Sequence, residues 1–320
     1  MNDDNFLEES EALSFLALCD LRGVGFETLK RVSRERIDFS AFLSSELSSE
    51  TVQKISVNPS FSKLREHFST EAARERGFSE ARRKLDHLRR RQIEIVFPAH
   101  LLFPKKLLDL RDTPSWLFVE GDASVLNMSA ITAVGSRKIS AEGKWLANYF
   151  GFCLDNLKAA TVSGLAEGVD QIVHRASIAA GMPTIAVLGT GILSDYPKGS
   201  HELRKRIVDG GGTVITEYLP NDTVNARNFV RRNRLQAALG QLVFPIEWGE
   251  KSGTAHTVKF AAELARPIVY ARTPTQPDFN WIPKNLLSNS GRFTLPAEHD
   301  NFFEFLSSKI EEKPAQQLLI

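Results

Sequence analysis

The sequence predicts an α/β protein in which a doubly wound, mostly parallel, Rossmann-like sheet follows an N-terminal helical domain. After residue 92, short apolar runs rich in β-branched residues alternate with helical stretches, which is the pattern of a parallel sheet covered by helices. Residues 10–90 instead place apolar side chains at helical spacing. A length of 320 residues is enough for two domains.

The first predicted domain covers residues 1–90 and is helical. Glu11–Cys19 carries a broad apolar stripe, and Leu21–Val32 contains a glycine pair between two short amphipathic helices, which predicts a helix-hairpin-helix. Glycine N–H groups at a helix start can bind a phosphate, and a helical corner without a ligand fits these residues equally well. The basic run at 82–91 is interpreted as a solvated helix face or linker in preference to a nucleic-acid contact.

The second predicted domain covers residues 91–311, and residues 312–320 form a C-terminal tail. Its strands are expected at 93–97, 116–119, 130–134, 160–163, 184–188, 213–216, 242–246 and 267–271. Helices are expected between them at 140–158, 168–180, 200–210, 230–239 and 253–265, with a short helix at 300–311. The proline-containing stretch 272–292 is expected to be a loop.

Composition and charge are those of an ordinary soluble protein. Hydrophobic residues make up 42% and charged residues 25% of the chain. Because the net charge is +1, any affinity for nucleic acid must come from local positive charge. The acidic N-terminus is unlike a targeting peptide, and no apolar run reaches the length of a membrane helix. Cys19 and Cys153 have no Cys or His partner at metal-ligand spacing, so both are expected to act as small, buried hydrophobic side chains. Two unpaired cysteines fit a protein of the reducing cytoplasm.

The strongest functional signal is a cluster of arginines with no acid among them, directly before the apolar run Leu242–Ile246, which predicts a buried strand. Guanidinium groups bind phosphates through paired N–H donors. A cationic segment next to a parallel sheet therefore predicts a polyanionic ligand, most often one that carries phosphate. The cluster comprises Arg227, Arg231, Arg232 and Arg234, and Asn233 lies within it as a candidate partner for a phosphate or a base.

Loops at the carboxyl ends of the predicted strands supply further candidate ligands, because open parallel sheets bind their ligands there. The loop after the first long strand combines a glycine, a hydroxyl and two cations before a helix capped by Ser140. It matches neither a G-x-G-x-x-G sequence nor a Walker A loop, and an ion pair between Arg137 and a carboxylate is the alternative. The phosphate-binding candidates in these loops are Gly135, Ser136, Arg137, Lys138, Ser163, Gly164, Ser252, Gly253 and Thr254.

Catalytic machinery is not evident in the sequence. Asp170 and His174 share a helix face, and a structural pair is favoured there over a metal or acid–base site. Tyr196, Phe229 and Trp248 are candidates for stacking on bases, although aromatic side chains more often belong to a core. No nucleophile has an evident base and orienting group, and no spacing makes a metal site. We therefore expect a binding protein with no catalytic residues, metal or cofactor.

Taken in order, these loops resemble the DNA-processing protein A family (DprA, also called Smf). Each motif alone is weak, and the ordered set is specific over roughly residues 92–300. The matching segments are FPKKLLDLRDTPSWLFVEGD (103–122), AVGSRK (133–138), VSGLAEGVDQIVHRASIAAG (162–181), TIAVLGTGILSDYPKGSHEL (184–203), GGTVITEYLP (211–220), FVRRNRLQAALG (229–240) and SGTAHTVKFAAELARPIVY (252–270).

The resemblance implies a Rossmann-like domain that binds single-stranded DNA, usually as a homodimer. Such proteins protect incoming DNA during natural transformation and help to load the RecA recombinase. Family members commonly carry an N-terminal helix-hairpin-helix or sterile-alpha-motif domain, and the resemblance implies that residues 10–80 form it. The resemblance thus implies a cytoplasmic protein of DNA processing, uptake or recombination, without a membrane partner. Two cationic segments of the family are carried over. Its glycine–serine/threonine–arginine loop falls on Gly135, Ser136 and Arg137, and its arginine–asparagine–arginine segment falls on Arg232, Asn233 and Arg234.

Some features depart from the family pattern. Glu167 stands where a basic or small residue is usual, Val230 replaces the usual proline, and the winged-helix domain of many members is expected to be absent. Related phosphoribohydrolases carry a Pro-Gly-Gly-x-Gly-Thr-x-x-Glu loop, whereas residues 249–257 lack the glycine pair and the glutamate. The missing residues argue against hydrolysis of that kind. The alternative function is a nucleotide-binding sensor, or a nucleotide-processing enzyme of the same superfamily, with a role in phage defence.

Overall fold

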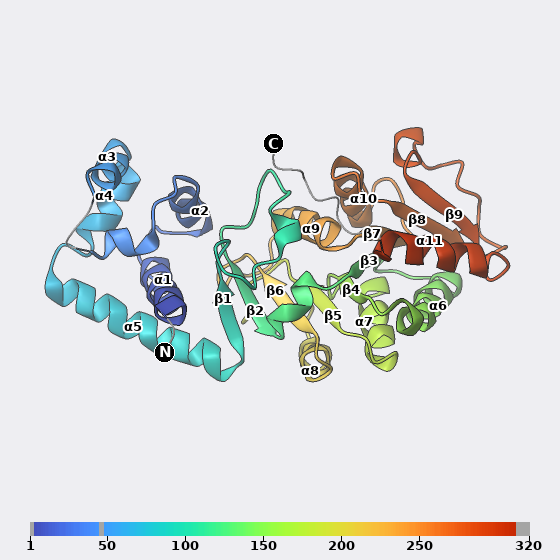
Figure 1. Ribbon diagram of the computed structural model, residues 1–320, viewed down its shortest axis with the longest axis horizontal. Helices are drawn as coiled ribbons and strands as arrows, with labels where there is room; N and C mark the ends of the chain where they lie inside the picture. Colours follow the sequence, from blue (N-terminus) through green and yellow to red (C-terminus); the bar gives the residue numbers. More distant parts are fainter. Residues whose placement is uncertain (1–2, 45–47, 312–320) are drawn as a thin grey trace. The chain divides into compact units, whose positions relative to one another are not determined.

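The computed structural model describes residues 3–44 and 48–311 of the chain (Figure 1). The chain divides into two compact units. The first contains the residues up to His100 together with Ser115–Phe118, and the second contains Leu101–Pro114 and the chain from Val119 onward. The C-terminal tail predicted at 312–320 lies outside the described residues.

Helices form most of the first unit, as the apolar spacing predicts. Phe15 lies at the centre of its core, with ring centroids 5.1 Å from Phe39, 5.7 Å from Phe97 and 4.7 Å from Trp116. The elements are α1 (Asp3–Cys19), α2 (Phe26–Arg34), η1 (Phe39–Phe42), α3 (Ser49–Val57), α4 (Pro59–Glu66), α5 (Glu71–Arg90) and strand β1 (Ile93–Val96).

The basic run at 82–91 lies largely on α5. Three of its cations form ion pairs within the first unit: Arg83 with Glu80 on the same helix, Lys84 with Asp20, and Arg89 with Glu9 at 3.0 Å. The last two pairs join α5 to α1 and to the turn that follows α1. The run therefore contributes ion pairs along a solvated helix face.

A nine-stranded sheet confirms the predicted fold class. Its strand order is β1-β2-β6-β5-β4-β3-β7-β8-β9, and every pairing from β6 to β9 is parallel. The chain moves outward from β3 through β4, β5 and β6, and then returns to the other side of β3 with β7. The strands after β1 are β2 (Leu117–Gly121), β3 (Ala130–Gly135), β4 (Ala160–Ser163), β5 (Thr184–Val187), β6 (Thr213–Thr216), β7 (Leu242–Ile246), β8 (Ile268–Arg272) and β9 (Ser290–Thr294).

Strand β9 lies at the end of the stretch that was expected to be a loop. Gly291 and Arg292 give it little β propensity, but all its residues pair with β8, from Ser290 opposite Ile268 to Thr294 opposite Arg272. Phe293 is buried in the core of the second unit. Pairing and burial, neither of which is a local property of the sequence, therefore make this segment a strand.

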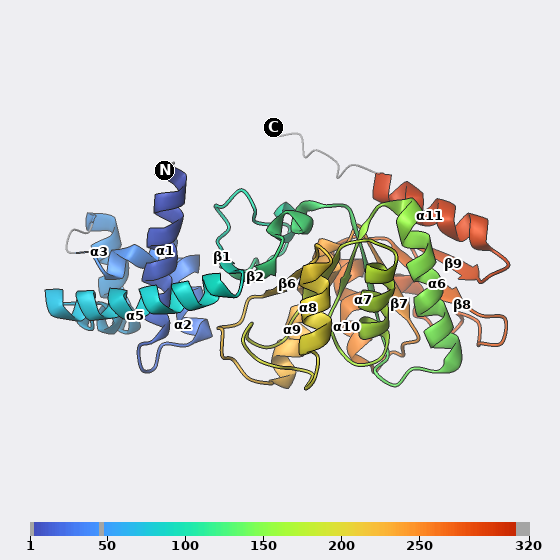
Figure 2. The ribbon, with the colours of Figure 1, turned by 90° about the horizontal axis from the view of Figure 1, so that it is seen from below.

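Helices cover both faces of the sheet in the second unit, as expected of a doubly wound fold. Figures 1 and 2 show α6, α7, α8 and α11 on one face and α9 and α10 on the other. The bounds are α6 (Ala141–Leu157), α7 (Val169–Ala179), α8 (His201–Asp209), α9 (Ala226–Leu239), α10 (Gly253–Glu263) and α11 (His299–Glu311), with short turns η2 (Lys105–Leu107), η3 (Ala123–Asn127) and η4 (Lys284–Leu286).

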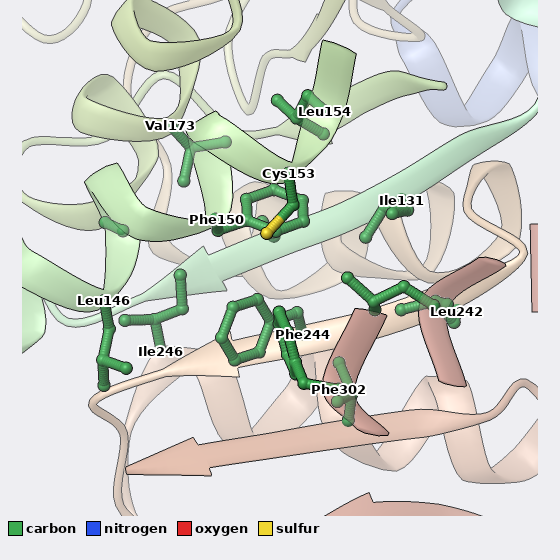
Figure 3. Close-up of a cluster of buried hydrophobic side chains, with 14 of the residues drawn as sticks. Ile131, Leu146, Phe150, Cys153, Leu154, Val173, Leu242, Phe244, Ile246 and Phe302 are labelled. Carbon is green, nitrogen blue, oxygen red and sulfur yellow. The ribbon is translucent and has the colours of Figure 1, made fainter. Parts of the chain in front are cut away.

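A large apolar cluster fixes β3 and β7 beneath α6, α7 and α11 (Figure 3). Phe244 of β7 lies at its centre, with ring centroids 5.4 Å from Phe150 and 5.7 Å from Phe302. Cys153 is buried in the same cluster, and burial raises the pKa of its thiol to about 11. Close packing here gives the loops that follow β3 and β7 a rigid base.

None of the helices in residues 3–44 and 48–311 combines the length and the apolar character needed to cross a bilayer.

Candidate nucleic-acid interface

A cleft of about 250 Å³ opens at the carboxyl ends of β3 and β7. These strands are neighbours at the point where the strand order reverses, which is the position where open α/β sheets bind ligands. The cleft is formed by the loops after β3 and β4 and by the facing ends of α9 and α10. Its lining residues are Val134, Gly135, Ser136, Arg137, Ala166, Asp170, Phe229, Val230, Arg232, Asn233, Gln236, Ser252, Gly253, Thr254 and Thr257.

The loop after β3 begins with a close approach between two strands. A Cβ atom on Gly135 would lie 2.0 Å from the carbonyl oxygen of Ile246, so only glycine fits at this position. The Ser136 hydroxyl then donates to the Lys138 carbonyl at 2.6 Å and accepts from the Lys138 N–H at 3.1 Å. This local turn fixes the loop and leaves the Arg137 side chain exposed at the cleft.

Arg232 lies at the floor of the cleft and is only 4% exposed. Its Nη1 donates to the carbonyl of Gly164 at 3.0 Å and to that of Val187, and its Nε donates to Asn233 at 3.2 Å. Burial lowers the pKa of Arg232 to about 10, which still leaves the side chain charged at neutral pH. Arg232 is thus a fixed, partly desolvated cation at the base of the site.

Gly164 makes room for this buried guanidinium. A Cβ atom at position 164 would lie 2.5 Å from Nη1 of Arg232. The Gly164 N–H donates to Asp170 Oδ2 at 3.0 Å, while its carbonyl accepts from Arg232. Burial raises the pKa of Asp170 and Arg232 opposes that shift. The backbone N–H and carbonyl of Gly164 therefore link the Asp170 carboxyl group to the Arg232 guanidinium, and each of these polar groups would be costly to bury without a partner.

The aromatic ring of Phe229 lies close to both cleft arginines. The Cζ atoms of Arg137 and Arg232 lie 5.7 and 5.9 Å from the centre of this ring, within the range of cation–π attraction. Tyr196 packs on the same ring at 5.1 Å between centroids. Arg137 and Arg232, which come from distant parts of the sequence, therefore meet around one aromatic side chain.

The opposite wall is the start of α10. The Ser252 hydroxyl caps this helix by accepting from the N–H of Ala255 at 3.3 Å, and Gly253 and Thr254 follow it in the lining of the cleft. Asn233 donates from its side chain to the Gly253 carbonyl at 3.0 Å, which ties α9 to α10. A helix start carries partial positive charge and adds to the field of the arginines.

The remaining predicted cations lie outside this cleft. Arg234 donates to both carboxylate oxygens of Glu217 at 2.6 and 2.7 Å, and both side chains are buried. Arg231 pairs with Asp112 at 2.9 Å. Lys138 is exposed but does not line the cleft.

Ser163 and Gly164 also lie outside the lining. The Ser163 hydroxyl is buried and donates to the Ala133 carbonyl at 2.7 Å, so it braces β4 against β3. The cleft therefore brings together eight of the thirteen predicted residues, namely Gly135, Ser136, Arg137, Arg232, Asn233, Ser252, Gly253 and Thr254.

Five lining residues were not among the sequence candidates: Val134, Ala166, Val230, Gln236 and Thr257. Two of them could have been found from helical spacing. Gln236 lies four residues after Arg232 on α9, and Thr257 lies three after Thr254 on α10, so each shares a helix face with a predicted residue.

Asp170 and His174 bond to different partners. Asp170 accepts from Gly164, whereas Nδ1 of His174 lies 2.8 Å from the Thr184 hydroxyl. Burial lowers the pKa of His174 to about 3, so the ring is neutral. Within the described residues, no group of three or more His, Cys, Asp or Glu side chains is placed to hold a metal ion.

The doubly wound sheet with an arginine-lined cleft at its switch point defines a Rossmann-like domain of the ligand-binding type. The model of the DNA recombination-mediator protein A family matches residues 94–301, and the chain belongs to that family. The relationship inferred from the ordered loop motifs is thereby confirmed.

Two relatives indicate how far the similarity extends. Protein Smf of Escherichia coli is 32% identical over 166 residues, which are 52% of this chain and 44% of that protein. DNA processing protein DprA of Streptococcus pneumoniae is 34% identical over 166 residues, which are 52% of this chain and 58% of that protein. The chain thus matches about half the length of these curated relatives.

Two solved structures share the fold. DprA of Streptococcus pneumoniae superposes with a TM-score of 0.60 at 23% identity, covering 89% of this chain and 94% of that one. DNA processing protein A of Helicobacter pylori gives a TM-score of 0.57 at 22% identity, covering 70% and 98%.

Proposed function

We propose that this chain binds single-stranded DNA through the cleft at the ends of β3 and β7. The observation that carries the proposal is the meeting of Arg137, Arg232 and Phe229 at one point, beside the start of α10. Cations paired with an aromatic ring suit a single strand, whose phosphates bind arginines while its unstacked bases pack on aromatic faces. DNA processing protein A of Helicobacter pylori, which shares this fold, binds single-stranded DNA. This similarity supports single-stranded DNA as the ligand of the present chain.

We further propose that the protein acts in DNA processing, uptake or recombination, as a cytoplasmic homodimer that works with RecA. Membership of the DNA recombination-mediator protein A family supports this role. The proposed activity is binding without hydrolysis, because the polar groups of the cleft hold one another in fixed positions. Asp170 bonds to Gly164 and Asn233 bonds to Gly253, so neither is arranged as a base beside a nucleophile.

A competition titration tests the proposal. The protein is mixed with a labelled single-stranded oligonucleotide, and unlabelled single strand or duplex of the same sequence is added. Single strand should displace the label at a much lower concentration than duplex, because duplex bases are not free to stack on Phe229. Equal competition by the two forms, or no binding at low salt, would reject the proposal.

The second candidate function is a sensor that binds a single nucleotide. The position of the cleft favours it, because related folds bind dinucleotides at the switch point of the sheet. A mononucleotide added to the same titration distinguishes it. Displacement of the oligonucleotide by an equal concentration of mononucleotide would favour the sensor.

A further inference from the structure

A second pocket, of about 230 Å³, lies at the carboxyl ends of β7 and β8. Four aromatic side chains line it: Trp248 after β7, Tyr270 in β8, and Phe279 and Trp281 in the segment that follows β8. This aromatic pocket is separate from the arginine-lined cleft and shares no lining residue with it.

The floor and one wall of the aromatic pocket are rigid. Tyr270 is buried, and its hydroxyl donates to the Leu286 carbonyl at 3.1 Å. Trp248 stacks on Tyr270 with the ring planes 18° apart and the centroids 6.2 Å apart. Both rings are therefore fixed before any ligand arrives, which lowers the entropic cost of binding a flat molecule.

Trp281 forms the exposed side of the aromatic pocket. It meets Trp248 edge to face, with centroids 4.9 Å apart, and remains 41% exposed. A large aromatic side chain held in place but open to solvent still has apolar surface to bury. It offers a second aromatic surface next to the fixed pair of Trp248 and Tyr270.

Polar groups at the rim favour an anionic or hydrogen-bonding ligand. Arg272 lines the pocket and donates to the Gln276 carbonyl at 2.8 Å, which holds the loop after β8. Glu247 also lines the pocket, but its carboxylate accepts from the N–H and hydroxyl of Ser140, at 2.9 to 3.0 Å. Since Ser140 caps α6, the negative charge of Glu247 is compensated by a helix start.

One short loop joins the aromatic pocket to the cleft. Trp248 lines the pocket and Ser252 lines the cleft, so at most about 14 Å separates their Cα atoms. The loop is closed further by two hydrogen bonds: Ser252 N–H to the Gly249 carbonyl at 2.9 Å, and Gly249 N–H to the Ser252 hydroxyl at 3.4 Å. A phosphate-binding surface and an aromatic surface this close together are the two parts of a single-strand binding site.

We propose that the aromatic pocket binds a nucleobase of the same DNA strand whose phosphates lie in the cleft, with Trp281 as the stacking residue. This inference rests on the proposed function. It adds a second base-binding position on the β7–β8 side of the sheet.

The test compares Trp281→Leu with Trp145→Leu. Trp145 is a matched control because it is also a partly exposed tryptophan, at 38%, and lines neither the aromatic pocket nor the cleft. Each protein is titrated with labelled oligothymidylate and with an abasic deoxyribose–phosphate oligomer of equal length. The abasic oligomer keeps the phosphates but has no base to stack.

Trp281→Leu should weaken oligothymidylate binding by roughly 5- to 150-fold, the range for losing one base–aromatic stack, and leave abasic binding unchanged. Trp145→Leu should bind both oligomers like the parent. Trp281→Phe should recover most of the loss, which separates stacking from misfolding.

Parent-like oligothymidylate affinity in Trp281→Leu, with DNA binding otherwise intact, would overturn the base pocket and leave the proposed function standing. An equal loss of affinity for both oligomers in Trp281→Leu, with no recovery of affinity in Trp281→Phe, would also overturn the base pocket. If the parent binds neither oligomer, the proposed function fails together with the base pocket.

Discussion

Arg137 and Arg232 both lie close to one aromatic ring, with their Cζ atoms 5.7 and 5.9 Å from the centre of Phe229. Their environments differ sharply. Arg137 is exposed on the loop after β3, whereas Arg232 is buried and bonded to the carbonyls of Gly164 and Val187. The same substitution should therefore have different consequences at the two positions.

Arg137→Ala should weaken single-stranded DNA binding with little change in melting temperature, because an exposed side chain contributes little to stability. Loss of one phosphate contact should reduce the steepness of the salt dependence by about 0.7, the contribution of one phosphate on a single strand. Arg175→Ala is the control, since Arg175 is an exposed arginine on α7 that bonds within its own helix. Identical salt dependence in the two variants would show that Arg137 makes no phosphate contact.

Arg232→Ala should lower both DNA affinity and stability. The substitution removes the donor to two buried carbonyls, at a cost of roughly 2 kcal/mol or more, and leaves Asp170 without its nearby positive charge. Denaturant unfolding of the variant measures the loss. A free energy of unfolding equal to that of the parent would mean that the buried hydrogen bonds of Arg232 contribute nothing to stability.

Arg234→Ala should destabilise the fold while leaving the DNA affinity of the folded protein unchanged. Removing one partner of a buried ion pair costs about 3–5 kcal/mol, and Arg234 is held by both oxygens of Glu217. The double variant Arg234→Met/Glu217→Leu should recover part of the stability, because no unpaired charge remains. Weak DNA binding by the well-folded double variant would instead place Arg234 in the DNA site.

Acid should destabilise the protein through His174. In the unfolded chain the ring takes up a proton near its ordinary pKa of 6.5, but in the folded protein burial lowers the pKa to about 3. Its contribution to stability is therefore fully present above pH 6.5 and declines as the pH falls toward 3. Unfolding free energies measured at about pH 7 and about pH 4 should differ less in His174→Gln than in the parent. An equal difference in both would assign the acid sensitivity to other groups.

Much of the fold could be predicted from the sequence because its signals are local. The runs that became β3 and β7 are apolar and β-branched, and the glycines and hydroxyls after them mark helix starts. Strand β9 could not be predicted, since Ser290–Thr294 becomes a strand through its pairing with β8 and the burial of Phe293.

The candidate site could be predicted only in part, for a similar reason. The arginine cluster contains no acid in sequence, yet Glu217 and Asp112 reach Arg234 and Arg231 from other segments. Sequence spacing places these cations on one helix but cannot show which of them meet a distant carboxylate. The aromatic pocket was missed because Trp248 and Trp281 meet only through the packing of the segment after β8.

The salt dependence of single-stranded DNA binding tests the central claim most directly. If Arg137, Arg232 and the start of α10 hold at least two phosphates, the logarithm of affinity should fall linearly with the logarithm of salt concentration. The slope should be steeper than about −1.4, at about −0.7 for each phosphate on a single strand. A slope near zero would contradict the account, because it would mean that the strand's phosphates do not lie in the arginine-lined cleft.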